Sequence, residues 1–135
     1  MLRNVGAVLV GLVIGAILNM ALVQLNLVLF PFPTDVDLGS PEELAAAIRS
    51  MPPAAWILVF AAHLGQAFVG GWVAARLGAS HPVALALVVG VVTMGGGIAN
   101  AISLSLPAWT WVEMPLYLVV AFAAGRLEAR RRASL

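Results

Sequence analysis

The sequence predicts an all-α protein, a bundle of four transmembrane helices with one short amphipathic helix in an outer loop. Hydrophobic residues make up 62% of the 135 residues and charged residues only 10%, whereas soluble domains have about 45–50% and about 25%. The mean hydropathy is +1.03. A chain this short cannot bury so much apolar surface as a soluble monomer, and its composition excludes an ordinary disordered tail.

The apolar residues form four long stretches within a single transmembrane domain, 1–135. We predict spans at about 5–30, 54–76, 82–106 and 108–127, an outer loop at 31–53 and a cytoplasmic tail at 128–135. About 20 apolar residues are needed to cross the hydrocarbon core, and the period-2 alternation of barrel strands is missing. The first stretch is longer than the apolar region of a signal peptide, which favours a retained helix. Short links predict that the last three spans are antiparallel neighbours.

The arginines predict the orientation of the chain. Six of the seven basic residues fall on one side of the four-span arrangement, and only Arg49 falls on the other, in a loop with four acidic residues. The positive-inside rule then places both termini in the cytoplasm. A basic cluster follows the last span, and we expect it to contact anionic lipid headgroups. Its members are Arg126, Arg130, Arg131 and Arg132.

The outer loop contains the predicted amphipathic helix. Ser40 and Glu43 form a capping-box pattern around Pro41, and the helix should extend to about Ser50. Apolar residues then share one face, so the helix should lie on the membrane surface or cap the bundle. The preceding acidic residues resemble the start of a Ca²⁺ loop, but the ligand pattern is incomplete, which favours a solvated acidic loop.

Polar residues recur in the outer half of every predicted span. Such groups are costly in lipid, so they usually face the bundle interior and often carry function. Glu113 is the only acidic residue within a predicted span, and His63 is its expected partner. A pair of this kind can hold or relay a proton, although amides and hydroxyls often only connect membrane helices. The candidate ligand-binding or proton-binding residues are Asn19, His63, Gln66, Asn100, Glu113 and Tyr117.

Glycines suggest close helix packing, with a flexible gate as the alternative. The glycines concerned are Gly11, Gly15, Gly70, Gly71, Gly95, Gly96 and Gly97. A weak internal repeat accompanies them, because Gly15-x-Ile17-x-Asn19 matches Gly96-x-Ile98-x-Asn100. If it is real, the chain consists of two parallel hairpins related by an axis along the membrane normal.

Several function classes lack support in the sequence. There is no cysteine and the net charge is only +1, so thiol chemistry is excluded and nothing indicates a nucleic-acid partner. No cofactor motif occurs, and one histidine with one glutamate does not make a metal site. No nucleophile–base pair is evident, so we do not expect an enzyme.

Short motifs along the chain resemble an uncharacterised group of small bacterial four-helix integral membrane proteins. The resemblance implies a location in the bacterial inner (cytoplasmic) membrane and implies no activity. The motifs are Pro31-x-Pro33, Glu43-Leu44, Met51-Pro52, Gly70-Gly71, Ala74-Ala75, Asn100 and Pro107-x-Trp109.

Three functional hypotheses follow from these observations. The leading one is a protein that binds or transports a small molecule or ion through an outward-facing polar pocket. Since four spans enclose little volume, a transport pathway favours a homo-oligomer. The second is an accessory or assembly subunit of a larger membrane complex, whose other subunits would be its partners. The third is a membrane-embedded enzyme.

Overall fold

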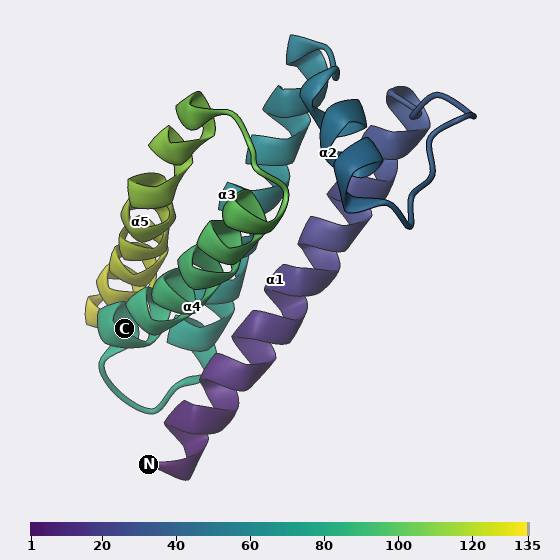
Figure 1. Cartoon of the computed structure of the whole chain (residues 1–135). Coiled ribbons are helices and arrows are strands. Elements are labelled where there is room, and N and C mark those ends of the chain that lie inside the picture. Colours follow the sequence, from purple (N-terminus) through teal and green to yellow (C-terminus); the bar gives the residue numbers. More distant parts are fainter. Residues whose placement is uncertain (135) are drawn as a thin grey trace.

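The computed structural model describes residues 1–134 and confirms the all-helical prediction for that part of the chain (Figure 1). Five α-helices and one 3-10 helix follow one another in residues 1–134. The start of α1 and the end of α5 lie at the same end of the bundle. The elements are α1 (Leu2–Leu29), α2 (Pro41–Arg49), α3 (Pro53–Leu77), α4 (Pro82–Ser103), η1 (Ala108–Val112) and α5 (Glu113–Ala133).

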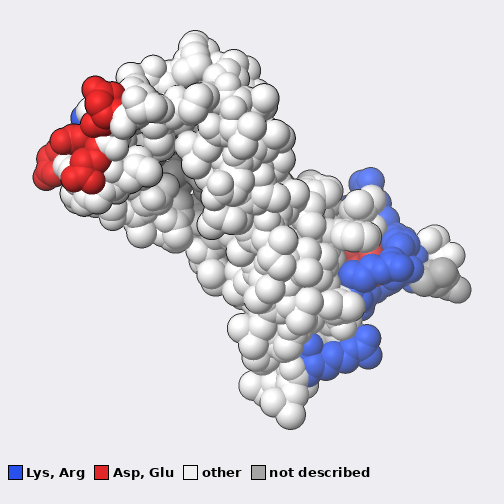
Figure 2. Space-filling view, turned by 90° about the vertical axis from the view of Figure 1, so that its right-hand side faces the viewer, with Lys and Arg blue, Asp and Glu red and all other residues white. Residues whose placement is uncertain are grey.

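In residues 1–134, four helical segments are long and apolar enough to cross a membrane: α1, α3, α4 and the continuous stretch Ala108–Ala133. Charged side chains gather at the two ends of the molecule, with a broad uncharged surface between them (Figure 2). We call the end that carries α2 and the acidic loop the α2 end. The opposite end, which carries both chain termini and most of the arginines, is the arginine end.

Helix α3 is the centre of the bundle, because it packs against α1, α4 and α5, whereas α1 and α4 touch only over a short stretch. Glycines allow the closest approach, between α1 and α3. A Cβ on Gly11 would collide with the carbonyl oxygen of Gly70, and a Cβ on Gly15 would lie 2.6 Å from that of Gln66. The absence of side chains at these positions lets the two backbones touch.

The third and fourth long segments differ from the predicted spans at the α2 end. Helix α4 ends at Ser103, and Ser105 adopts a positive φ of 47° before Pro107. The chain then forms the 3-10 helix η1, and the α-helix begins only at Glu113. Pro115 lacks the N–H that would bond the carbonyl of Trp111 in a continuous α-helix, which accounts for this late start.

A short helix forms in the loop where the sequence indicated one. Ser40 is its N-cap, and the Ser40 hydroxyl accepts a hydrogen bond from the Glu43 N–H at 3.4 Å. The Glu43 carboxylate accepts from the Asp37 N–H at 2.8 Å, so it stabilises the loop before the helix. Helix α2 makes few close backbone contacts with the long helices. Its position at a membrane surface and the two-hairpin repeat stay predictions.

Candidate functional site

A histidine and a glutamate meet in the half of the bundle nearer the α2 end. The Nδ1 atom of His63, on α3, lies 2.9 Å from Oε1 of Glu113, at the start of α5. The Glu113 side chain is 4% exposed and that of His63 is 18% exposed. Glu113 occupies the first turn of α5, directly after η1, and its backbone N–H donates to the carbonyl of Thr110. An imidazole and a carboxyl group in direct contact can exchange a proton.

Tyr117 completes this group from the next turn of α5. Its side chain is buried, and its ring stacks on the His63 ring with the centroids 6.4 Å apart. Gly97 on α4 makes room for the phenol, since a Cβ there would lie 2.7 Å from the Tyr117 hydroxyl oxygen. Three helices therefore fix the positions of His63, Glu113 and Tyr117.

A cavity of about 490 Å³ adjoins the pair, and we call it the polar cavity. Residues from α1, α3, α4 and α5 line it, so the structure brings five of the six candidate residues to one cavity and the sixth, Glu113, into contact with His63. The polar lining residues are Asn19, His63, Gln66, Thr93, Asn100 and Tyr117. Thr93 donates its hydroxyl hydrogen within its own helix, to the carbonyls of Val89 and Gly90.

A second cavity, of about 240 Å³, lies under α2, and we call it the apolar cavity. Leu44 and Ile48 of α2 contribute to its wall, which is almost entirely apolar. His63 and Asn100 line both cavities, so the two adjoin. The sequence did not reveal this second cavity, because its wall combines the loop, α2 and three long helices.

Two amide oxygens at these cavities have no hydrogen-bond partner among residues 1–134: Oδ1 of Asn19 and Oδ1 of Asn26. Asn19 lines the polar cavity, and Asn26, which is 2% exposed, lines the apolar cavity. Buried polar atoms nearly always have a partner, and leaving one unpaired is costly. Asn26 lies on the same helix face as Asn19, and this spacing was the signal in the sequence that could have added it to the candidate residues.

The predicted packing glycines divide into two groups. Gly11, Gly15, Gly70, Gly71 and Gly97 each lie close to another helix or its side chains. The other two, Gly95 and Gly96, have nothing within 4 Å of the position a Cβ would take. In this chain those two make no close helix contact, and Gly96 instead lines the polar cavity.

The acidic loop uses its carboxylates for its own turns. Asp37 Oδ1 accepts a hydrogen bond from the Gly39 N–H at 2.8 Å, and Glu43 accepts from the Asp37 N–H. No cluster of three or more histidine, cysteine or acidic residues that could hold a metal ion occurs in residues 1–134.

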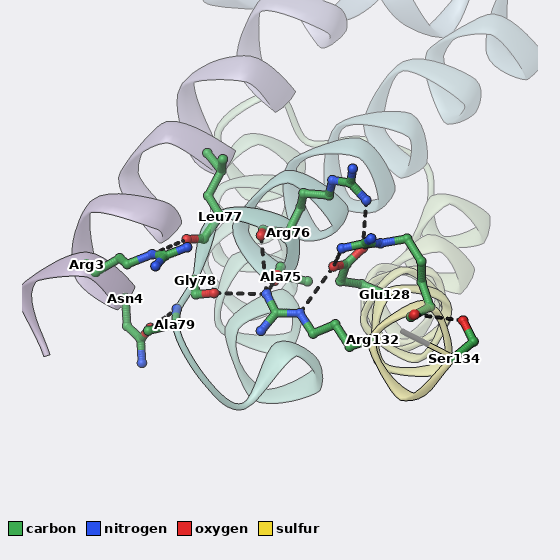
Figure 3. Close-up of polar contacts among 11 residues, drawn as sticks. Arg3, Asn4, Ala75, Arg76, Leu77, Gly78, Ala79, Glu128, Arg132 and Ser134 are labelled. Carbon is green, nitrogen blue, oxygen red and sulfur yellow. Dashed lines mark hydrogen bonds and ion pairs between the residues drawn. The ribbon is translucent and has the colours of Figure 1, made fainter.

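Glu128 is a buried acid that the sequence interpretation missed, because the predicted last span ended one residue before it. Its side chain is fully buried at the arginine end (Figure 3). Arg131 donates to both of its oxygens at 2.9 and 2.6 Å, Arg132 donates at 3.1 Å, and Arg76 lies 3.6 Å away. The i, i+3 and i, i+4 spacing of Glu128 to these arginines on α5 was the available signal.

The same cluster closes the C-terminal end of α3. Arg132 donates to the carbonyl oxygens of Ala75 and Gly78, the latter at 2.9 Å (Figure 3). From α1, Arg3 donates to the Leu77 carbonyl at 2.9 Å. Two of the four arginines expected at lipid headgroups, Arg131 and Arg132, therefore also bind protein groups. Arg126 and Arg130 are exposed.

Searches among protein families, curated proteins and solved structures find no match to this chain.

Proposed function

We propose that this chain is a multi-pass protein of the bacterial inner membrane, with both termini in the cytoplasm, that binds or transports a small molecule or ion. One observation carries the proposal: polar side chains from four apolar helices surround one cavity beside the buried His63–Glu113 pair. Ionisable groups in such segments are costly to keep and usually mark a binding site or pathway.

The side chains around the cavity have different proposed roles, which follow from their chemistry. Glu113 and His63 form the charged centre and hold or exchange a proton. Gln66, Asn100 and Asn19 offer amide groups that orient a bound molecule. Because the pocket belongs to the α2 end, it opens away from the cytoplasm in this orientation. A homo-oligomer supplies the additional helices that a transport pathway needs.

A second candidate is an accessory subunit of a larger membrane complex. It is favoured by the open space at Gly95 and Gly96, where the backbone of another helix can approach α4 closely. In that case the partner is another membrane subunit, and the polar residues serve as interhelical hydrogen bonds. We propose no catalytic role, since the site offers no nucleophile beside a base.

Native mass spectrometry of protein extracted in lipid nanodiscs tests the leading proposal. Wild-type protein should carry a reproducible small-molecule adduct, and E113Q should lose it because the charged centre is gone. The exposed Glu42 provides the same chemical change outside the cavity, so E42Q should keep the adduct. Wild-type protein without an adduct, or an E113Q protein that retains it, contradicts the proposal. A fixed complex with another polypeptide supports the second candidate instead.

Substitutions at the neighbouring glycines Gly95 and Gly96 test binding in the polar cavity without changing His63 or Glu113. Neither Gly95 nor Gly96 has an atom within 4 Å of its Cβ position, but only Gly96 lines the polar cavity. The G96L variant should therefore fill the cavity and lose the adduct, whereas G95L should keep it. Equal loss in both variants would assign the effect to the outer surface of α4.

A further inference from the structure

The two cavities differ sharply in chemistry, and His63 and Asn100 belong to the walls of both. Six of the side chains that line the polar cavity carry an amide, hydroxyl or imidazole group. In the apolar cavity only three of the lining side chains do so, those of Asn26, His63 and Asn100. A molecule that occupies both must be polar at one end and mostly apolar along its body.

Unpartnered oxygens indicate which hydrogen-bonding groups such a molecule carries. Asn19 and Asn26 each present a buried acceptor without a partner in residues 1–134. They are seven residues apart on α1, or about 10 Å along the helix. Asn26 is 2% exposed and lies in the wall of the apolar cavity. Both oxygens have almost no accessible surface, so a donor on a bound molecule, such as a hydroxyl or amine, would satisfy such an atom after the asparagine side chain turns toward the cavity.

The charges around the two cavities exclude one class of molecule. No arginine lines either cavity, and the ionisable side chains there are His63 and Tyr117, with the Glu113 carboxyl group bonded to His63. An anion would enter a low-dielectric site beside a carboxyl group and without a guanidinium to pair with it, which is unfavourable. A neutral molecule carries no charge to desolvate, and a cation regains part of its desolvation cost from the nearby Glu113 carboxyl group.

We propose that the site binds an amphiphile whose polar groups are hydrogen-bond donors, neutral or cationic, with its apolar body in the cavity under α2. Its head group occupies the polar cavity near Asn19 and His63, and a donor contacts Oδ1 of Asn26. This inference rests on the proposed function, because it names the class of molecule that the same site takes.

Four probes separate the features of this proposal: octan-1-ol, octylamine, octanoate and ethane-1,2-diol. Their binding to wild-type protein is measured by native mass spectrometry from nanodiscs. The alcohol and the amine should bind, whereas octanoate should bind at least about tenfold more weakly because of its charge. Ethane-1,2-diol lacks the apolar body and should be similarly weak. Octanoate or the diol binding as tightly as octan-1-ol would overturn the proposal.

Variants of α1 test the contact with Asn26 directly. The N26L variant keeps an apolar wall but removes the acceptor, so octane-1,8-diol, whose two hydroxyl groups can reach Asn19 and Asn26 together, should bind about tenfold more weakly. Octan-1-ol, whose one hydroxyl group stays in the polar cavity, is the control and should bind as it does to the wild type. Gln24 is exposed on the same helix, and Q24L should bind both as the wild type does. The octyl probes also dissolve in lipid, so all proteins are compared in nanodiscs of the same composition. If N26L binds octane-1,8-diol as tightly as the wild-type protein does, the proposal is overturned.

The outcomes distinguish this inference from the proposed function. If wild-type protein carries an adduct that E113Q loses, but the octyl chain adds nothing to probe binding, the proposed function stands and the amphiphile inference falls. If no adduct and no probe binds to the wild-type protein, both fall.

Discussion

The arginine end surrounds its buried carboxylate with three guanidinium groups, whereas the α2 end leaves two buried amide oxygens of residues 1–134 without a hydrogen-bond partner. At the arginine end α1 and α3 touch through glycines, and Arg132 closes the end of α3. At the α2 end two cavities separate the long helices. The arginine end therefore has its buried charge paired, whereas the α2 end contains the unpaired atoms and the apolar cavity on which the proposed binding depends.

Removal of the buried carboxylate should have the largest effect on stability. In E128Q the buried carboxylate that accepts hydrogen bonds from Arg131 and Arg132 is neutralised. These arginines are 41% and 28% exposed and can regain water, so we expect the free energy of unfolding to fall by about 3 kcal/mol, the value of one or two charge-assisted hydrogen bonds. Unfolding in SDS, followed by circular dichroism, measures this loss. The E42Q variant changes an exposed acid in the same way and should be neutral. An E128Q protein as stable as E42Q would show that the cluster does not hold the arginine end.

A methyl group at the α1–α3 crossing should have the next largest effect. In G11A the new Cβ meets the carbonyl of Gly70, which is backbone and cannot move aside, so the helices must separate at a cost of about 2 kcal/mol. Gly6, on the same helix, has nothing within 4 Å of its Cβ position, and G6A is the matched control. Equal stability of the two variants in the SDS titration would contradict the close crossing.

The smallest effect, with the opposite sign, is expected at the α2 end. N26L removes an unpartnered buried oxygen, so the protein should become more stable by about 1 kcal/mol. The thermal midpoint measured without added probe reports this gain. A clear loss of stability would mean that Asn26 already has a partner that stabilises the fold. Together with weaker probe binding, a gain would show that the α2 end gives up stability for recognition.

Much of the fold could be predicted from the sequence, because long apolar stretches admit few structures besides helices. The contact between His63 and Glu113 could also be predicted, since both lie at similar depth and are the most costly groups in their segments. The boundary at Glu113 could not, because it depends on how Pro115 interrupts the hydrogen bonds of one turn. The apolar cavity could not either, because it depends on where the loop carries α2.

The roles of individual glycines were harder to predict from the sequence than the helices that contain them. Seven glycines in apolar stretches look alike in sequence, yet Gly11 contacts a neighbouring backbone and Gly96 borders a cavity. What separates them is whether another helix backbone lies opposite the glycine, as α3 does at Gly11, and no local pattern contains that information. Glu128 shows the opposite case, because two of its three arginine partners, Arg131 and Arg132, are within about one helical turn and that pattern was present in the sequence.

The weak attachment of α2 has a consequence for the rate at which a molecule could enter or leave. It makes few close backbone contacts with the long helices, although its Ala45 and Ala47 side chains are buried. The Arg49 side chain donates one long hydrogen bond to the carbonyl of Ser105, at 3.4 Å. Segments with few contacts open locally at much lower free energy than the whole protein unfolds. Local opening of α2 would uncover the apolar cavity, so exchange of its contents requires no unfolding of the membrane-length helices.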